Sequence, residues 1–460
     1  EFPLMDNARL TVHWYQAPLR ILWDNYRKFF GEQIDPDDSI DFTVPAISSG
    51  TTVNMQQASG FQQIADYMGL PHVASMDLSE ISAFPFRAYN KVWNYWYRDQ
   101  NLQDSMVENQ DDGPDNITSN DATSDYFLAN RGKRHDYFTS CLPKPQKGDA
   151  VSIPLGTSAD IATAASAGGA IGIYSASTAD HHLLDSDLAT VDVSATVGST
   201  AETNRMFADL TNATASTINQ LREAFAIQQF LERDMRGGTR FGEQILSHYG
   251  VQFQDVRYAP EFLGGGSVPI IVSPISNQSA TTGNVGDLAA IGTASMSGAG
   301  FTKAFDEPSV LLGLACVDAD LTYQHGLDRK WSYSTRYDFY WPEFAHLGEQ
   351  TVLNQEIFYQ NTAADNSVFG YQERYAELRH GMSRISKEFR SDNALTLDSW
   401  HLSEDEASLP TLGADWIESN PPFDRVMAVS TQNHFIADFY FDIRAARPLP
   451  TFGVPGLRRL

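Results

Sequence analysis

Alternation of apolar and polar side chains predicts β-strands near both ends of the chain. The clearest segments are Arg9–Tyr15 and, more strongly, His434–Arg444, in which every second residue is apolar. Successive side chains of a strand point to opposite faces of the sheet, so a two-residue period is typical of a half-buried strand. Other strand candidates stand beside Gly or Pro, at Val268–Val272, Ser309–Val317 and Arg425–Val429. Strands separated by such long tracts predict a β-sandwich with large loop insertions.

Two segments have the period of a helix. Thr217–Asp234 carries a stripe of apolar side chains, has Thr217 and Gln220 in capping-box spacing, and stops before Gly237 and Gly238. Ala83–Arg98 has a proline in its permissive first turn and apolar side chains on all faces. A helix that is apolar all round is expected to be buried, either within this chain or against another subunit.

Between Pro154 and Ala215 the composition shifts to Ala, Ser, Thr and Gly. A disordered linker would have this composition, but the apolar residues Ile171, Ile173, Tyr174, Leu183 and Leu184 favour a folded surface excursion. We therefore divide the chain into the first part of the β-sandwich over 1–153, an inserted tract over 154–215, and the remainder of the sandwich over 216–460.

Composition indicates a globular protein. Of the 460 residues, 42% are hydrophobic and 20% are charged, which excludes a disordered chain. The longest apolar runs are far shorter than the roughly 20 residues of a membrane-spanning helix, and no signal peptide opens the sequence. We therefore expect a soluble protein that is not secreted. The two cysteines, Cys141 and Cys316, cannot form a disulfide framework, and we expect both to be reduced and buried.

The net charge of -26 argues at first against a nucleic-acid partner, because phosphates are bound by Lys and Arg. The charge is unevenly distributed, however. Asn101–Asp125 and Ser152–Asn204 contain no Lys or Arg and hold thirteen of the twenty-six excess negative charges. The rest of the chain is only mildly acidic, which is compatible with a molecule that is acidic on one side and locally basic on the other.

Two basic stretches are candidates for contact with single-stranded nucleic acid. The first has Tyr137 and Phe138 interleaved, and binding of unpaired strands requires such rings beside cations. The second is terminal and meets no acid after Asp442. Alternative interpretations are a subunit-contact loop that pairs with acids and a solvated tail, respectively. The cations concerned are Arg131, Lys133, Arg134, Lys144 and Lys147 in the first stretch, and Arg444, Arg447, Arg458 and Arg459 in the second.

No catalytic motif is found. The chain lacks an H-E-x-x-H sequence, a P-loop and a G-x-S-x-G elbow. His181 and His182 are adjacent and would point apart, so we interpret them as exposed polar residues and not as metal ligands. Gly264–Gly266 lacks the spacing of a dinucleotide loop and predicts a turn or a close approach of backbones. Carboxylate pairs such as Asp37 and Asp38 carry little weight in an acidic protein, and we expect no enzyme, cofactor or metal site.

Several multi-residue motifs are spread in order over nearly the whole chain. They include Pro3–Ala8, Leu22–Asp24, Phe86–Asn94, Arg98–Gln103, His135–Ser140, Pro145–Gly148, Arg236–Arg240, Leu321–Gln324, Thr335–Pro342, Phe369–Glu377 and Asn420–Pro422. Matches of this length are highly specific. Together they resemble one protein family, the major capsid proteins of the gokushovirus branch of the Microviridae.

The resemblance implies a mainly β fold, an eight-stranded antiparallel jelly roll whose long loop insertions contain a few helices. It implies a structural protein of a single-stranded-DNA bacteriophage, which forms pentamers and a T=1 icosahedral shell around a circular genome. An internal scaffolding protein, a DNA pilot protein and a host cell-surface receptor are the further implied partners. The implied location is the virion, after assembly in the bacterial cytoplasm.

The inserted tract stands where the family carries a variable insertion that builds protrusions at the three-fold axes, and these are implied to meet the host. Two other classes compete with this interpretation. A β-sandwich carbohydrate-binding or carbohydrate-active protein would also be rich in Trp and Asp, and a non-viral structural protein would also lack a catalytic motif. Closed shells in electron micrographs would distinguish the capsid protein from a monomeric hydrolase.

Overall fold

The computed structural model of the protein describes most of the chain. The described residues are 4–47, 52–56, 60–117, 124–151, 160–163, 171–175, 180–186, 191–197, 206–209, 218–253, 258–276, 278, 286, 288–427 and 433–447, and between 160 and 209 it is the backbone that is described.

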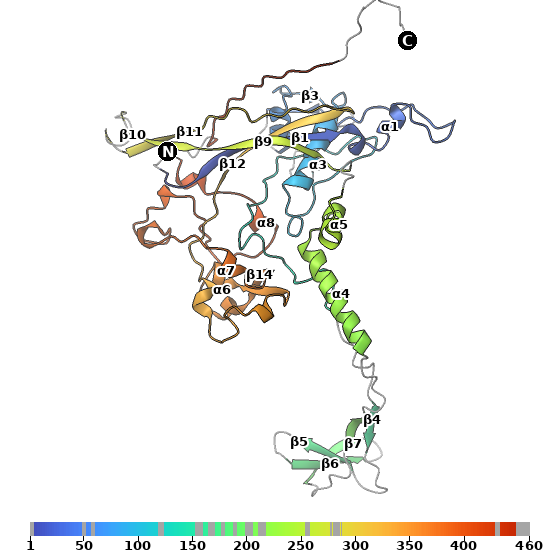
Figure 1. Ribbon diagram of the computed structural model, residues 1–460, viewed down its shortest axis with the longest axis vertical. Helices are drawn as coiled ribbons and strands as arrows, with labels where there is room; N and C mark the ends of the chain where they lie inside the picture. The colour runs from blue at the N-terminus through green and yellow to red at the C-terminus, as the bar shows by residue number, and fades with distance from the viewer. Residues whose placement is uncertain are drawn as a thin grey trace, which may run out of the picture.

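A three-stranded antiparallel sheet of order β12-β1-β9 forms the centre of the body (Figure 1). β1 (Ala8–Pro18) is the middle strand and pairs along its whole length with β12 (Ser309–Ala319). On its other edge it pairs with β9 (Glu261–Pro269). The predicted strands at Arg9–Tyr15 and Ser309–Val317 are therefore confirmed, and strands far apart in the sequence are neighbours in the sheet.

The glycine run of β9 allows this strand to approach β1 closely. A Cβ atom on Gly265 would lie 2.2 Å from the carbonyl oxygen of Val12, so no side chain fits there. The register also shifts between Trp14 and Tyr15, opposite Gly264. This irregularity bends the strand pair, as a β-bulge does, and confirms the predicted close approach of backbones.

The remaining strands of the body form two-stranded antiparallel pairs. They are β2 (Thr52–Val53) with β3 (Met76–Asp77), β10 (Ile271–Ser276) with β11 (Leu288–Thr293), and β13 (Glu349–Leu353) with β14 (Val368–Glu373). The predicted strand Val268–Val272 covers the end of β9 and the beginning of β10, with Ile270 between them.

Helices fill the long connections. The α-helices are α1 (Tyr26–Phe29), α2 (Gly60–Tyr67), α3 (Phe84–Trp96), α4 (Ile218–Arg236), α5 (Phe241–Tyr249), α6 (Asn354–Ile357), α7 (Ala376–Arg379) and α8 (Ala414–Ile417). Short 3-10 helices are η1 (Leu19–Ile21), η2 (Arg329–Ser332), η3 (Pro342–Phe344), η4 (Ala363–Asn366), η5 (Lys387–Phe389), η6 (Asp398–Trp400) and η7 (Phe423–Arg425). Both predicted helices are confirmed as α3 and α4, although the predicted cap residue Thr217 lies outside the described residues.

α3 packs against the central sheet and buries its apolar side chains within this chain. Phe86, Tyr89 and Trp93 join a core cluster against which Leu312 and Leu314 of β12 also pack. Between these positions Arg87 is buried and pairs with Asp115 at 2.6 Å. The second largest cluster lies around β13, β14 and α8 and includes Tyr137, Phe138, Val352, Phe369 and Trp416.

Five strands lie within the inserted tract. β4 (Asp160–Thr163) pairs with β8 (Met206–Asp209), and β5 (Ile171–Ser175), β6 (Asp180–Ser186) and β7 (Val191–Val197) form a second sheet. Figure 1 shows these strands standing away from the body, beyond the N-terminal end of α4. None of the side chains of α4 is buried.

Two predicted strands are wrong. Residues 433–447 form no strand, and Arg425 ends a 3-10 helix, while 428–432 lie outside the described residues. Alternation favours an extended backbone, but a strand also needs hydrogen bonds to a neighbouring strand, and this segment pairs with none of the described strands. The segment instead touches the body through rings, with Phe441 centred 5.6 Å from Trp14. Its outward residues Ile436 and Tyr440 are 101% and 91% exposed.

The mainly β fold with helices in its insertions is thus confirmed at the level of class. Among the described residues the largest sheets have three strands. No helix in the described part of the chain is long and apolar enough to cross a membrane.

Candidate functional site

The first basic stretch is held by a short antiparallel bridge to the end of α8. The backbone N–H of Lys133 donates to the carbonyl of Ile417 at 2.6 Å, and the N–H of Ser419 donates to the carbonyl of Arg131 at 2.8 Å. Gly132 and Glu418 form the bridge itself. Because an extended segment alternates its side chains, Arg131 and Lys133 are directed to the same side of the segment.

Acids of the same chain pair with Arg131, Lys133 and Arg134. Arg131 lies 3.5 Å from Asp318 and donates to the Cys316 sulfur at 3.2 Å. The buried Lys133 lies 3.4 Å from Glu404. Arg134 lies 3.2 Å from Asp320 and has 43% of its side chain exposed. The predicted pairing with acids is therefore present, but it is internal to one chain, and only Arg134 presents a substantial exposed surface.

The rings that follow the stretch are not available for stacking on bases. Tyr137 and Phe138 are 4% and 1% exposed and belong to the core around β13 and β14. Tyr137 donates its hydroxyl to Glu356 at 2.8 Å, and burial together with that carboxylate raises the pKa of Tyr137. The expectation that either ring contacts unpaired bases is corrected, because both are needed to fill the interior.

Lys144 and Lys147 belong to a loop beside α4. The backbone N–H of Lys147 donates to the carbonyl of Leu231 at 3.2 Å, which ties the loop to the helix. Lys144 is exposed and Lys147 is half-buried. Within the described residues neither ammonium group lies within ion-pair distance of an acid. These two lysines are therefore freer to meet an external anion than Arg131 or Lys133.

The terminal cations are exposed where they are described. Arg444 pairs with Asp442 at 3.0 Å, and 88% of its side chain is exposed. Arg447 is exposed on the same segment, three residues farther on. Arg458 and Arg459 lie outside the described residues. The seven predicted cations that the structure describes are thus not gathered into one site; they form a neutralised group, a loop beside α4 and a terminal segment.

A surface of exposed rings was missed by the sequence analysis. We name Trp331, Tyr337, Phe339, Tyr340 and Trp341 the aromatic platform; each ring is between 46% and 73% exposed. Hydrogen bonds fix it, since Trp341 donates its backbone N–H to the Tyr375 hydroxyl at 3.1 Å and its indole N–H to the Arg336 carbonyl at 2.7 Å. A count of rings would have detected it, because six aromatic residues fall between 331 and 341.

Cations lie beside the aromatic platform. The Arg336 guanidinium lies 4.7 Å from the centre of the Tyr337 ring. Arg374 lies equally close to the Tyr375 ring and donates to the Tyr337 carbonyl at 3.0 Å. Fixed rings with arginines are typical of protein interfaces, because large rigid groups lose little conformational entropy on binding.

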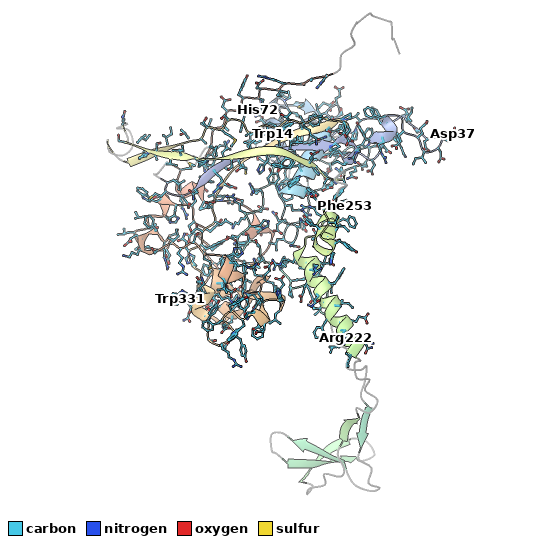
Figure 2. The ribbon with its side chains drawn as sticks, viewed as in Figure 1. Trp14, Asp37, His72, Arg222, Phe253 and Trp331 are labelled. Carbon is cyan, nitrogen blue, oxygen red and sulfur yellow. The ribbon has the colours of Figure 1, made fainter. Side chains whose placement is uncertain are left out.

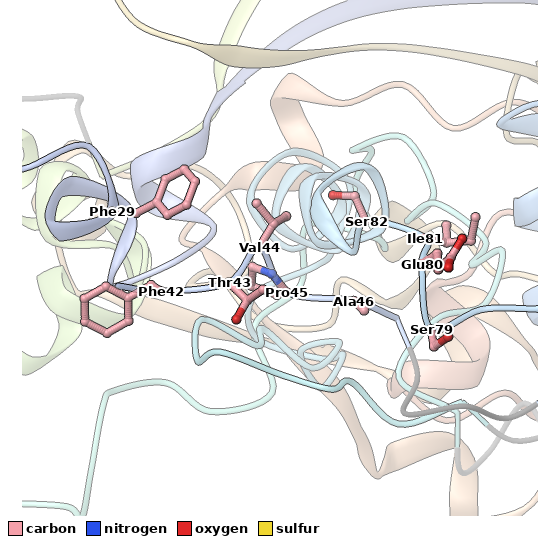
Figure 3. A pocket seen from close by; sticks show the side chains of 10 residues that line it. All are labelled: Phe29, Phe42, Thr43, Val44, Pro45, Ala46, Ser79, Glu80, Ile81 and Ser82. Carbon is pink, nitrogen blue, oxygen red and sulfur yellow. The ribbon is translucent and has the colours of Figure 1, made fainter. Parts of the chain in front are cut away.

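A shallow, mainly apolar hollow lies in the described surface (Figure 3). It holds about 400 Å³ and lies between the α1 region, with Phe29, Phe42 and Val44, and the loop Ser79–Ser82. Within the described residues no group of three or more His, Cys, Asp or Glu side chains could hold a metal ion. The side chains of His181 and His182 lie outside that description.

The two thiols are free. Cys141 is buried, and burial is the main cause that raises its pKa above its usual range. Cys316 is only partly buried and accepts the hydrogen bond from Arg131. The expectation of two buried thiols therefore holds for Cys141 and only in part for Cys316.

Comparisons with known proteins agree on one family. The family described as "Capsid protein (F protein)" matches residues 1–457. Capsid protein VP1 of Bdellovibrio phage phiMH2K is 41% identical over 476 residues, which cover 98% of this chain and 86% of the relative. The proteins of the same name from Chlamydia phage 1 and Spiroplasma virus 4 are 36% and 33% identical, cover this whole chain, and are themselves covered over 88% and 87%. The chain therefore belongs to the capsid protein (F protein) family, and its resemblance to the gokushovirus capsid proteins of the Microviridae is confirmed.

Proposed function

We propose that the chain is the shell-forming subunit of a T=1 icosahedral particle that encloses circular single-stranded DNA. The observation that carries the proposal, beside family membership, is the exposed surface. Among the described residues, large apolar side chains such as Phe225, Trp331, Phe339 and Ile436 are each more than half exposed. Apolar surface of this kind is typical of a protein–protein contact. A subunit that buries these side chains against copies of itself would have the large interfaces of an obligate assembly.

In this proposal the body forms the wall of the shell as an eight-stranded jelly roll, and five copies meet in each pentamer. The extended segment 433–447 supports contact between copies, because it has the alternation of a strand but lies outside every described sheet of its own chain. An internal scaffolding protein and a DNA pilot protein take part in assembly, which proceeds in the reducing bacterial cytoplasm. Free thiols at Cys141 and Cys316 are compatible with such a compartment.

The inserted tract 154–215 forms the outer protrusion that meets a host receptor. Support comes from its position away from the body in Figure 1 and from its charge, since residues 152–204 contain six acids and no Lys or Arg. Inside the shell these acids would repel the genome, whereas outside they favour solubility. Chymotrypsin, which does not need Lys or Arg, should cut intact particles in this tract first. Protection of the tract until the particles are disrupted would place it inside.

The test of shell formation is sedimentation of the purified chain, alone and together with the internal scaffolding protein. We expect fast-sedimenting closed particles in at least the second sample, and we expect the DNA inside them to resist nuclease. A folded monomer in both samples at high concentration would contradict the proposal and would favour a monomeric carbohydrate-binding protein.

A further inference from the structure

Exposed cations lie beside the aromatic platform. Lys330 and Arg384 are 52% and 62% exposed and share Asp328 as an ion-pair partner. The exposed Arg336 lies against the Tyr337 ring. Residues 328–343 contain three acids as well as three cations, so these cations form a local rim of positive charge and not a net cationic surface.

An exposed segment of opposite charge projects from another part of the body. We name residues 31–44 the acidic arm; it contains five Asp or Glu residues and no Lys or Arg. Its turn is fixed by Asp38, which accepts the backbone N–H groups of Ile34 at 3.1 Å and of Asp35 at 3.2 Å. These two hydrogen bonds lower the pKa of Asp38. The arm is therefore a folded projection with a defined charge.

The acidic arm also presents apolar side chains to solvent. Ile34 is 87% exposed and Ile40 is 50% exposed. At the base of the arm, Phe42 and Val44 line the hollow of about 400 Å³ that Figure 3 shows. The acidic arm therefore offers apolar side chains as well as carboxylates to a partner.

The platform and the arm lie on different sides of the same chain. Figure 2 shows Asp37 at one extreme of the body and Trp331 on the side opposite to it. The platform and the arm of one molecule therefore do not cover each other. Two unlike complementary patches on one chain make a head-to-tail contact, and repetition of such a contact closes a ring when the rotation allows it.

We propose that the acidic arm of one copy of this chain docks on the aromatic platform of the next copy. The arm carboxylates face the cationic rim formed by Lys330, Arg336 and Arg384, while Ile34 and Ile40 cover the exposed rings. The acidic arm decides between a second copy and a nucleic acid: bases could stack on the rings of the platform, but a nucleic acid would repel the arm carboxylates, whereas a second copy matches both patches at once. The inference rests on the proposed shell, because it names one contact by which the shell is built.

Charge reversal tests the contact. The arm variant Asp35→Lys/Asp37→Lys and the platform variant Lys330→Glu/Arg336→Glu should each lower the yield of closed particles at least about tenfold, because like charges then meet. The combination of all four substitutions should restore assembly. The matched control Asp104→Lys/Asp149→Lys changes the net charge as the arm variant does, at exposed positions outside both patches. This control variant should assemble normally. A decrease in its particle yield equal to that of the arm variant would overturn the inference.

A second measurement uses the unmodified protein. Particles assembled from a mixture of ¹⁴N- and ¹⁵N-labelled chains are treated with a carbodiimide, which joins an amine to a carboxylate in direct contact. We expect peptides that link Lys330 to the acidic arm, with both isotopes in one linked pair. Particles that form without this link, and reversal variants that do not rescue each other, would overturn the arm contact alone. Absence of particles from the unmodified protein would overturn the shell itself, and a platform variant that assembles but does not retain DNA would assign the platform to nucleic acid.

Discussion

The ammonium group of Lys133 lies 3.4 Å from a carboxylate oxygen of Glu404 and 4.7 Å from the centre of the Trp416 ring. Only 5% of the lysine side chain and 14% of the glutamate side chain are exposed. Burial raises the pKa of Glu404, and the charge of Lys133 opposes that shift. A cation that appeared free in the sequence thus neutralises an interior acid.

Lys133→Ala should destabilise the folded chain by about 3–5 kcal/mol, because it leaves Glu404 buried without its partner. Without Lys133 the pKa of Glu404 rises further. When folding raises the pKa of an acid, the folded chain loses stability as pH rises above the pKa that the acid has in the unfolded chain, about 4.3 for Glu. Denaturant titrations at several pH values should therefore show a difference in the free energy of unfolding between the variant and the unmodified protein. This difference should be smallest near pH 4 and should grow toward pH 7.

The double variant Lys133→Met/Glu404→Leu serves as the control, since it removes both charges and retains apolar volume. It should be close to the unmodified protein in stability and should package DNA normally. Failure of stable particles of this variant to retain DNA would show instead that Lys133 contacts the genome.

Tyr137→Phe tests the role of the ring next to the basic stretch. The ring stays packed beside Phe138, but Glu356 loses a hydroxyl donor while it keeps the Arg329 guanidinium at 3.0 Å. Thermal or denaturant unfolding should show a decrease in stability of about 1–3 kcal/mol. The DNA content of assembled particles should be unchanged, and reduced DNA content at full stability would contradict the buried role.

Gly265→Ala tests the close approach of β9 to β1. A Cβ atom there would meet the Val12 carbonyl oxygen at 2.2 Å, whereas a Cβ atom on Gly300 would meet nothing within 4 Å. We expect Gly265→Ala to cost about 1–3 kcal/mol or more and Gly300→Ala to cost much less, as measured by chemical denaturation. Equal stability of the two variants would mean that the strand pair is not packed in this way.

Exposed cations away from interior acids are the residues that we propose to contact DNA. Replacement of Lys144, Arg444 and Arg447 by Ala should weaken DNA retention and should reduce the slope of its salt dependence by up to about 0.7 for each phosphate that is no longer neutralised. Arg222→Ala is the control, because this exposed residue lies on α4 near the inserted tract (Figure 2). An unchanged salt slope in the triple variant would exclude these residues from the DNA surface.

The sequence predicted those elements whose own pattern of apolar and polar residues matches the period of a strand or a helix. Arg9–Tyr15 and Ser309–Val317 alternate because they are strands of one half-buried sheet, and Ala83–Arg98 is apolar all round because α3 is buried in the core. The strand prediction at His434–Arg444 was wrong because alternation does not say whether another strand pairs with the segment. Long-range pairing is likewise invisible to spacing, so the partners of Arg131 and Lys133, at Asp318 and Glu404, were not predicted.

Electron cryo-microscopy of the particles formed by this chain tests the central claim most directly. We predict a closed T=1 shell in which the jelly-roll body forms the wall, the tract 154–215 projects outward, and the acidic arm of each copy rests on the aromatic platform of its neighbour. A folded chain that stays monomeric in the presence of the internal scaffolding protein, or a shell whose inner surface is formed by the tract 154–215, would contradict it.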